Sequence, residues 1–433
     1  MAENINLREL SLEMLIEINE KGKYSHLVLR DVLDKYQYIS KQERAFLTRL
    51  TEGTIEHQIE LDYIIDSFSK TKVKKMKPLI RNLIRMSVYQ IKYMDSVPDS
   101  AVCNEAVKLS RKRGFGQLSG FVNGVLRNIA RNISKVKYPN ETDINKYLSV
   151  KYSMPEWIVE QWIADYGKEK AIQILEGFYS ENPISIRTNL TKCTPAQLKE
   201  RLESEGVRVG QVADLDYAFT ISDFDYLMGL DSFNEGWFYV QDISSMMVAE
   251  SCEVKAGDYV IDVCAAPGGK STHIAELLGG TGMVEARDLT EYKVSLIEDN
   301  INRHELSNMK AVVWDATVHD DAADNKADVL ICDLPCSGLG VLGKKTDIRY
   351  KMSKEQEAEL AGLQLKILDT VHRYVKTGGT LIYSTCTIDT LENEKNVELF
   401  VERHPEFKLV SMRQMYPGQT GADGFFIARL KRI

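Results

Sequence analysis

The segment YVIDVCAAPGGK, residues 259–270, joins a short apolar run to a turn rich in small residues. The apolar run Tyr259–Val263 is typical of a buried strand, and a helical stretch follows over 269–278. Small residues and glycines let a backbone approach a bound molecule closely. The N-terminus of the following helix also offers unpaired N–H groups to an anion. This strand–turn–helix unit decides the fold of the C-terminal half.

The same alternation continues through the C-terminal half. Helices are expected over 290–304 and 354–376, and they separate further apolar strands at Gly282–Ala286, Ala311–Trp314, Val329–Cys332 and Gly379–Tyr383. Strands that alternate with helices predict a parallel sheet with right-handed crossovers. Residues 236–433 are therefore expected to form an α/β, Rossmann-like domain. In such sheets ligands bind beyond the carboxyl ends of the strands.

The N-terminal part has a different pattern. Residues 1–138 form successive amphipathic stretches, which predict an all-α bundle, and Ser40 with Glu43 fits a capping box at one helix start. Residues 139–235 combine helical stretches with the alternating run Ile184–Asn189, which predicts a small α+β module. The expected fold class is thus multidomain. Three domains agree with the soft prior of roughly 150 residues per domain for a chain of 433.

Composition limits the class of protein. Hydrophobic residues make up 44% and charged residues 27%, as in ordinary soluble domains. The start MAENINLREL lacks the layout of a secretory signal, and no apolar run approaches the ~20 residues of a membrane span. Seven scattered cysteines without a CxxC pair indicate reduced thiols, with neither a disulfide framework nor structural zinc. We expect a cytoplasmic monomer without a metal or a membrane partner.

Charge is distributed unevenly along the chain. The net charge of -8 is unusual for a nucleic-acid-binding protein. From Lys70 to Lys137, however, sixteen Lys and Arg face three acidic residues, a local charge of +13, whereas residues 1–69 carry -5. Phosphate binding needs only a local basic face. The alternative is a solvated helix surface, which a charge run alone does not exclude.

Acidic residues follow three expected strands. Asp288 lies about 20 residues after the glycines, where a carboxylate can accept hydrogen bonds from ribose hydroxyls, and Asp315 and Asp333 follow the next two strands. The loop is neither GxGxxG nor GxxxxGK[ST], so a dinucleotide or ATP fits less well than S-adenosylmethionine, whose carboxylate can meet the helix end. The alternatives are a tight turn without a ligand and acids that cap helices.

Two cysteines follow the fourth and fifth expected strands. Cys336 lies in DLPCSG, residues 333–338, and Cys386 lies in STCT, residues 384–387. If those strands are neighbours, both thiols face one crevice. A lone cysteine is more often a small buried hydrophobe. Two cysteines at adjacent strand ends, beside a cofactor loop, favour a catalytic pair.

A thiol pair suits one reaction on a pyrimidine. A thiolate that attacks carbon 6 of cytosine makes carbon 5 enamine-like and able to accept a methyl group, so one hard step becomes two easier ones. A second cysteine can serve as an acid or base when the thiolate is released. A carboxyl group near N3 can stabilise the altered ring, and the base must leave its stack to reach the site.

The motifs CAAPGGK, DLPCSG and STCT together resemble the NOP2/Sun family of RNA (cytosine-5) methyltransferases, and residues 236–242 and 423–428 also resemble family motifs. The resemblance implies that Cys386 is the nucleophile and that Cys336 assists product release. It implies S-adenosyl-L-methionine as cofactor, bound by Cys264, Ala265, Ala266, Pro267, Gly268, Gly269, Lys270, Asp288, Asp315 and Asp333. Lys270 and Asp333 would also approach the target base.

The N-terminal part resembles the NusB-like RNA-binding domain, through RMSVYQ at 85–90, residues 98–107 and FVNGVLR at 121–127. A NusB-like domain ahead of this catalytic domain is similar to the arrangement in bacterial enzymes that methylate 16S ribosomal RNA. The resemblance covers essentially the whole chain, and it implies 16S rRNA as substrate and no DNA partner. Three positions depart from the usual family residues without removing a reacting group: Ser244, Leu334 and Thr346.

Three alternatives remain at this point. The same chemistry could act on transfer RNA or 23S rRNA. A non-catalytic RNA-binding assembly factor would suit the basic segment, but not two cysteine motifs with a full cofactor loop. A DNA cytosine methyltransferase fits less well, because enzymes of that class are known for a nucleophile in the PC motif and lack the TC cysteine.

Overall fold

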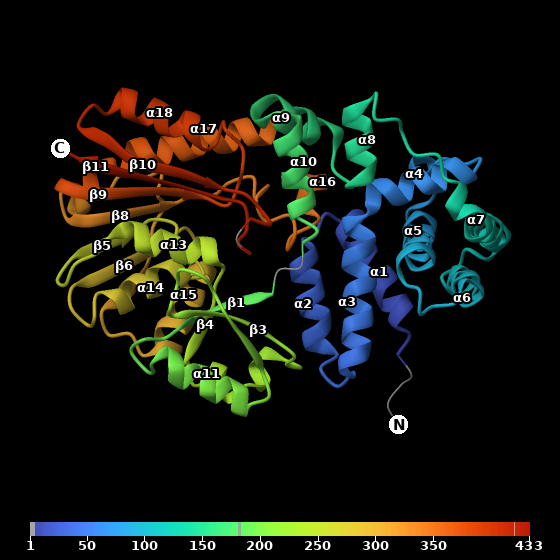
Figure 1. Ribbon diagram of the computed structural model, residues 1–433, viewed down its shortest axis with the longest axis horizontal. Helices are drawn as coiled ribbons and strands as arrows, with labels where there is room; N and C mark the ends of the chain where they lie inside the picture. Colours follow the sequence, from blue (N-terminus) through green and yellow to red (C-terminus); the bar gives the residue numbers. More distant parts are fainter. Residues whose placement is uncertain (1–4, 181–182, 420) are drawn as a thin grey trace. The chain divides into compact units, whose positions relative to one another are not determined.

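The computed structural model describes residues 5–180, 183–419 and 421–433 (Figure 1). The chain forms two compact units. The first comprises the described residues up to Glu176 together with Leu342–Lys351, and the second comprises Gly177–Val341 and Met352–Ile433. Among the described residues, every helix is too short or too polar to cross a membrane.

The first unit is helical, as the sequence predicts. Its core surrounds α5, which packs against α1, α3, α4, α6 and α7. The predicted capping box is present, because the Ser40 hydroxyl accepts from the Glu43 N–H and the Glu43 carboxylate accepts from the Ser40 N–H. The elements are α1 (Leu7–Asn19), α2 (Ser25–Lys35), α3 (Lys41–Glu56), α4 (Gln58–Phe68), η1 (Val73–Lys75), α5 (Pro78–Tyr93), α6 (Asp99–Lys112), η2 (Gly116–Leu118), α7 (Ser119–Asn132), η3 (Ile133–Lys135), α8 (Ile144–Lys151), α9 (Glu156–Tyr166), α10 (Lys168–Gly177) and α16 (Ile348–Lys351).

A segment from the C-terminal half folds into this first unit. The buried carboxylate of Asp347 accepts hydrogen bonds from the Ser25 N–H at 3.0 Å and the Ser25 hydroxyl at 2.5 Å. The fully buried guanidinium of Arg349 donates to the Tyr152 carbonyl at 3.3 Å. The chain that follows Cys336 therefore passes through the helical unit before it returns at Met352. The domain boundaries expected near residues 138 and 235 stay predictions.

The second unit begins with a small antiparallel sheet. Its strand order is β2-β3-β1-β4, and β1 pairs with both β3 and β4. Its elements are β1 (Ile184–Thr188), α11 (Pro195–Ser204), β2 (Arg208–Gln211), β3 (Ala218–Ser222), η4 (Leu227–Gly229), α12 (Asp231–Asn234) and β4 (Phe238–Val240). This sheet, with α11 and α12, confirms a small α+β module, whereas α8 and α9, which lie in the sequence range expected for that module, belong to the first unit.

A larger mixed sheet follows, with seven strands among the described residues in the order β10-β11-β9-β8-β5-β6-β7. The five strands from β9 to β7 are parallel, which confirms the predicted Rossmann-like fold. At the β9 edge, β11 and β10 add an antiparallel hairpin that the sequence analysis did not include among its strands. The strands are β5 (Tyr259–Asp262), β6 (Met283–Asp288), β7 (Met309–Val313), β8 (Ala327–Asp333), β9 (Val375–Thr385), β10 (Phe407–Met415) and β11 (Phe425–Arg432).

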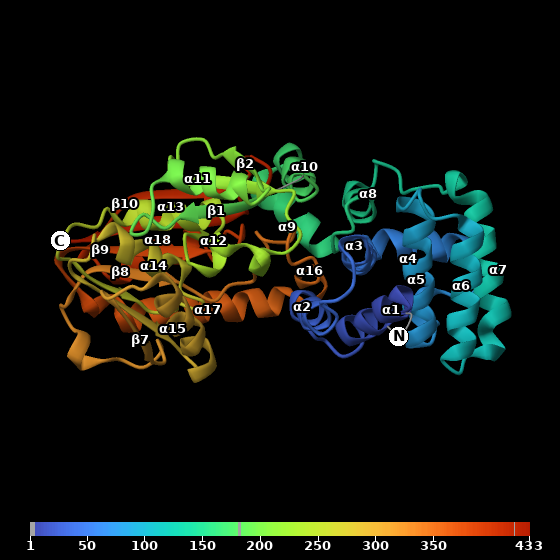
Figure 2. The ribbon, with the colours of Figure 1, turned by 90° about the horizontal axis from the view of Figure 1, so that it is seen from below.

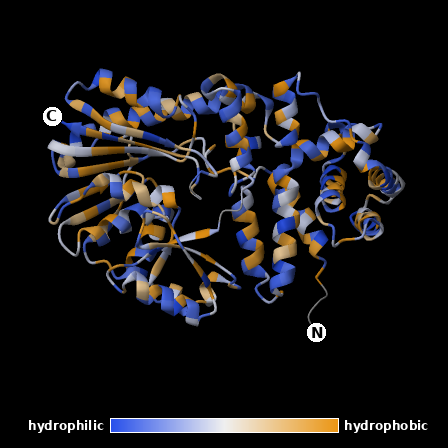
Figure 3. Cartoon of the chain, viewed as in Figure 1, coloured by the Kyte–Doolittle hydropathy of each residue, from blue (hydrophilic) through white to orange (hydrophobic). Residues whose placement is uncertain are grey.

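Helices cover both faces of the large sheet (Figures 1 and 2). One hydrophobic core packs α17 (Lys354–Val371) and α18 (Glu394–Arg403) against the strands. The core on the opposite face includes α13 (Ile243–Cys252), α14 (Gly269–Leu277) and α15 (Glu291–His304). The short helices η5 (Asp321–Ala323) and η6 (His372–Tyr374) complete the unit. Figure 3 shows hydrophobic residues in orange along the strands that these helices cover.

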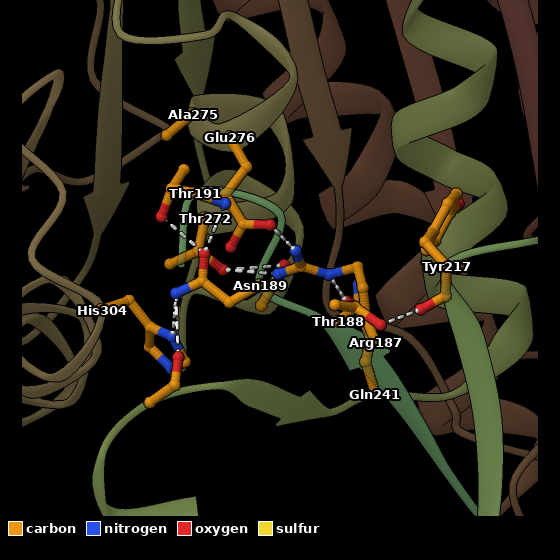
Figure 4. A network of polar contacts seen from close by, with 12 residues as sticks. Arg187, Thr188, Asn189, Thr191, Tyr217, Gln241, Thr272, Ala275, Glu276 and His304 are labelled. Atoms are coloured by element: carbon orange, nitrogen blue, oxygen red, sulfur yellow. Dashed lines mark hydrogen bonds and ion pairs between the residues drawn. The ribbon is translucent and has the colours of Figure 1, made fainter. Parts of the chain in front are cut away.

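A buried polar network joins the small sheet to α14 (Figure 4). The Arg187 guanidinium, on β1, donates to Gln241 Oε1 at 2.7 Å and to Thr272 Oγ1 at 3.3 Å, and it pairs with the Glu276 carboxylate. It also lies 4.3 Å from the ring centroid of Tyr239. Burial raises the pKa of Glu276 to about 7, while the Arg187 charge acts in the opposite direction. The network fixes the helix that begins at the glycine loop.

Asn189 extends the network on the other side. Its Nδ2 donates to the Gly236 carbonyl at 2.9 Å and lies 3.1 Å from His304 Nδ1. The His304 ring stacks on Tyr239 at 3.4 Å between centroids. Burial and the nearby cations lower the pKa of His304 to about 2, so the imidazole stays neutral beside the Arg187 charge.

We predict that Arg187→Met destabilises the protein by about 3–5 kcal/mol, because it leaves the buried Glu276 carboxyl group without its counter-charge. Urea unfolding followed by circular dichroism would measure the loss. The double variant Arg187→Met/Glu276→Leu is the matched control, since it removes both charges together and should recover a large part of the stability. A double variant no more stable than Arg187→Met would contradict this account.

Candidate active site

The two cysteine motifs meet at the carboxyl edge of the large sheet. Strands β8 and β9 are parallel neighbours, with Asp333 opposite Ser384. The two cysteine motifs therefore follow adjacent strands, as a shared crevice requires. The Sγ atoms of Cys336 and Cys386 lie 3.2 Å apart. Neither cysteine forms a disulfide, and both side chains are partly exposed. The arrangement presents two sulfur atoms to one reaction centre.

Buried polar side chains hold the backbone on both sides of Cys336. Glu392 Oε2 accepts from the Ser337 N–H at 3.0 Å and from Gln364 Nε2 at 2.7 Å. Gln364 Nε2 also donates to the Pro335 carbonyl at 2.8 Å. Burial raises the pKa of Glu392 to about 7, although the Ser337 hydrogen bond acts in the opposite direction.

Asn393 holds the backbone around Cys386 in the same manner. Its Oδ1 accepts from Thr385 Oγ1 at 2.5 Å, and its Nδ2 donates to the Thr387 carbonyl at 3.2 Å. The adjacent residues Glu392 and Asn393 therefore support both cysteine loops. The sequence alone does not reveal these two residues, since polar residues in a polar stretch carry no periodic signal.

Two glycines let a third segment approach this centre. The Gly340 N–H donates to the Cys386 carbonyl at 3.0 Å, and the Gly424 N–H donates to the Gly340 carbonyl at 2.8 Å. A Cβ atom at Gly340 would lie 2.0 Å from the Gly424 carbonyl oxygen. The motif at 423–428 thus packs its backbone against the cysteine loops, an approach that only glycine permits.

Lys270 and Asp333 place opposite charges beside the thiols. Asp333 Oδ2 accepts from Lys270 Nζ at 2.6 Å, and Asp333 Oδ1 accepts from the Ser384 hydroxyl at 2.8 Å. Burial acts to lower the pKa of Lys270. The negative charges of Asp333, Asp262 and Cys386 act in the opposite direction and outweigh it, so the pKa is raised overall. The ammonium group stays charged, and a fixed cation stabilises a nearby thiolate.

The thiol of Cys336 has the opposite tendency. Its hydrogen bond with Cys386, its partial burial and the charges of Cys386 and Glu392 raise the pKa of Cys336 well above the usual value. Cys336 therefore keeps its proton at neutral pH. The pair can hold one proton-bearing sulfur beside one sulfur available as a nucleophile.

The glycine loop lies between β5 and α14. Gly268 precedes the helix with φ +105°, a conformation that favours glycine, and it has no side chain that could cap the first N–H groups of α14. Those groups suit an anionic carboxylate. The Ala266 N–H donates to Asp288 Oδ2 at 3.0 Å, which connects the loop to the end of β6. The predicted cofactor residues Cys264, Ala265 and Pro267 complete this turn.

The three acidic residues lie at the carboxyl ends of three strands of the large sheet. Asp288 ends β6 and Asp333 ends β8, on either side of β5, and Asp315 lies just beyond β7. Asp288 is buried and lies 3.0 Å from Lys293 Nζ. Asp315 accepts from the Thr317 N–H and hydroxyl, both at 2.8 Å, so it also stabilises its own turn.

Three family models match this chain. The model described as 16S rRNA methyltransferase RsmB/F matches residues 249–431. The NusB family model matches residues 5–131. A ferredoxin-like domain of RsmF/B-like methyltransferases matches residues 154–224. The three matches follow the same order along the chain as the helical unit, the small sheet and the large sheet.

Relatives and solved structures agree with these matches. The probable ribosomal RNA small subunit methyltransferase B of Bacillus subtilis is 36% identical over 99% of both chains. The protein of the same description from Synechocystis is 31% identical over 99% of this chain and all of its own. The crystal structure of PH0851 is 26% identical, with a TM-score of 0.84 over 99% of both chains. NSun6 from Pyrococcus horikoshii, solved with SFG, is 24% identical with a TM-score of 0.59 over 64% of this chain, and supports the fold alone. This chain therefore belongs to the ribosomal RNA small subunit methyltransferase B family.

Proposed function

We propose that this protein transfers a methyl group from S-adenosylmethionine to carbon 5 of a cytosine in 16S rRNA. The family supports methylation of ribosomal RNA. The choice of carbon 5 rests on one observation, the 3.2 Å separation of the Cys336 and Cys386 sulfur atoms. A ring nitrogen or a ribose hydroxyl is already a nucleophile, whereas carbon 5 needs a thiol to activate its ring.

The glycine loop and the strand ends fit S-adenosylmethionine. The open N-terminus of α14 would meet its carboxylate, and Asp288 would accept from its ribose hydroxyls. SFG, an analogue of S-adenosylmethionine, was present in the structure of NSun6, which has the same fold. When bound, the cofactor supplies an electrophilic methyl group.

Residues of this chain would carry out the other steps of the reaction. The Cys386 thiolate bonds to carbon 6, which moves electron density to carbon 5. The Lys270 cation and the Asp333 carboxyl group, 2.6 Å apart, can stabilise charge that develops on the ring. After methyl transfer, a base removes the proton from carbon 5. The electron pair of that carbon–hydrogen bond forms the double bond between carbons 5 and 6, and the bond from carbon 6 to sulfur breaks, with its electrons returning to the Cys386 sulfur. Cys336 is close enough to take part in that release as an acid or base.

The comparisons with known proteins also bear on the RNA substrate. The NusB family match and the description of the B. subtilis relative favour small-subunit RNA over transfer RNA or 23S rRNA. We propose that the protein acts in the cytoplasm as a monomer. Nucleotide-resolution mapping of 5-methylcytosine in RNA, with and without this protein, would distinguish the RNA substrates.

We predict that Cys386→Ala abolishes methylation and also the covalent adduct with 5-fluorocytosine RNA, because the bond to carbon 6 cannot form. Tritium transfer and denaturing gels would measure the two losses. Cys103→Ala, which changes a buried thiol in the helical unit, should retain both activities. Methylation or an adduct in Cys386→Ala would refute the assigned nucleophile.

We predict that Cys336→Ala behaves differently and accumulates covalent RNA, since the adduct forms but release is slow. A slower-migrating band with unmodified substrate RNA would report this on a denaturing gel. A variant that leaves no shifted band would count against the proposed role.

We predict that Glu392→Ala lowers kcat by about 10- to 100-fold, because small displacements of a reacting group carry penalties of that size. Glu392→Gln should retain more activity, since its amide oxygen can still accept from Ser337. Glu398→Ala, on the exposed side of α18, is the surface control. Equal kinetics for Glu392→Ala and Glu398→Ala would show that the buried acid does not position Cys336.

A further inference from the structure

A pocket in the helical unit lies outside the catalytic machinery. It has a volume of about 320 Å³ and is lined by Glu60, Lys92, Tyr138, Tyr147 and Lys151. Sites for small ligands begin at about 300 Å³. Two aromatic rings and two ammonium groups therefore surround a space of sufficient size for part of a nucleotide.

On the wall of the pocket that α4 and α5 contribute, the positive and negative charges neutralise each other. Glu60 is 5% exposed, and its carboxylate pairs with the Lys92 ammonium and accepts from the Tyr138 hydroxyl at 2.8 Å. Burial acts to raise the pKa of Glu60, but hydrogen bonds from His57, Lys92 and Tyr93 lower it to about 2. The acid is thus ionised and neutralised within the wall, and it fixes the Tyr138 ring at the rim of the pocket.

The wall contributed by α8 is more accessible. Tyr147 and Lys151 are four residues apart on one face of the helix. The Lys151 ammonium lies 5.6 Å from the centroid of the Tyr147 ring, and its side chain is exposed. Its hydrogen bond with Tyr152 raises the pKa of Lys151, so the cation persists at neutral pH. A ring and a charge are therefore available together to an incoming group.

The surroundings favour a polyanion. The exposed residues Lys135 and Lys137 immediately precede Tyr138, at the end of the segment with a local charge of +13. Aromatic faces bind unpaired bases, and nearby cations bind the phosphates between them. A base-paired duplex keeps its bases stacked away from such rings. An acidic peptide would use the lysines but would gain little from two tyrosines.

We propose that this pocket binds one unpaired nucleotide of the RNA substrate, with its base against the tyrosine rings and its phosphate at Lys151. The inference rests on the proposed function only in taking RNA as the substrate. Tyr147 and Lys151 lie between the family matches at 5–131 and 154–224. The proposed contacts of Tyr138, Tyr147 and Lys151 with the nucleotide would thus lie outside both matched segments.

Binding of a fluorescein-labelled single-stranded RNA of about ten nucleotides to the full chain would test the proposal, with a duplex of the same sequence in parallel. We expect Tyr147→Ala to weaken single-strand binding by about 5- to 100-fold, as loss of base stacking does elsewhere. Tyr147→Phe should bind like wild type because it keeps the ring. Duplex binding should be nearly unchanged in both variants.

The salt dependence of RNA binding tests the role of Lys151. Lys151→Gln should reduce the slope of log Kd against log salt by about 0.7, the value for one single-strand phosphate contact. Lys146→Gln, an exposed residue of α8 that does not line the pocket, is the matched control. Equal effects of Lys146→Gln and Lys151→Gln would indicate diffuse attraction and overturn the pocket. Unchanged single-strand binding by Tyr147→Ala would overturn it as well.

Different results would refute the proposed methylation and the proposed nucleotide site. Absence of cytosine methylation by the wild-type protein would refute the proposed chemistry and leave RNA binding measurable. If Tyr147→Ala binds an acidic peptide more weakly but RNA equally well, the pocket belongs to a protein partner and the nucleotide site is refuted. Thermal unfolding of each variant would confirm that the fold is retained.

Discussion

The parallel pairing of β8 with β9 is the constraint on which the rest of the site depends. Each strand ends in a short motif with one cysteine, and the register places Asp333 opposite Ser384. Parallel neighbours end at the same edge of a sheet. The sulfur atoms of Cys336 and Cys386, which are fifty positions apart in the sequence, therefore lie 3.2 Å from each other. A shift of one residue would turn one motif to the other face. The chemistry of the site is therefore a property of the sheet register.

Register alone does not fix a side chain, and the protein adds buried polar contacts for that purpose. Glu392 and Asn393 are both fully buried, and together with Gln364 they bind backbone groups beside the two cysteines. A buried carboxylate costs free energy unless it is hydrogen-bonded. Its presence here, with several donors, is explained by the rigidity it gives to two loops that must meet.

The sequence predicted the larger features of the fold because they follow from periodic patterns. Strands β5 to β9, the helical unit and the glycine loop each have an apolar pattern or a glycine-rich turn of recognised form. The hairpin of β10 and β11 was not predicted, since β10 is largely exposed and its sequence FKLVSMRQM has little alternation. Asp347 and Arg349 were also outside prediction, because only the tertiary fold shows that a segment of the C-terminal half completes the helical unit. The same holds for Glu392 and Asn393, whose partners lie far from them in sequence.

The proposed function requires two chemically identical side chains to behave differently, and the surroundings of the two cysteines do differ. Cys386 interacts with the Lys270 cation, which is itself held by Asp333. Cys336 instead faces the charge of Glu392 as well as the neighbouring thiol, and it keeps its proton. When one sulfur of such a close pair ionises, like-charge repulsion and hydrogen bonding both favour the neutral form of the other. In the proposed mechanism, the neighbouring thiol and Glu392 together keep the proton on Cys336, and Lys270 favours Cys386 as the nucleophile.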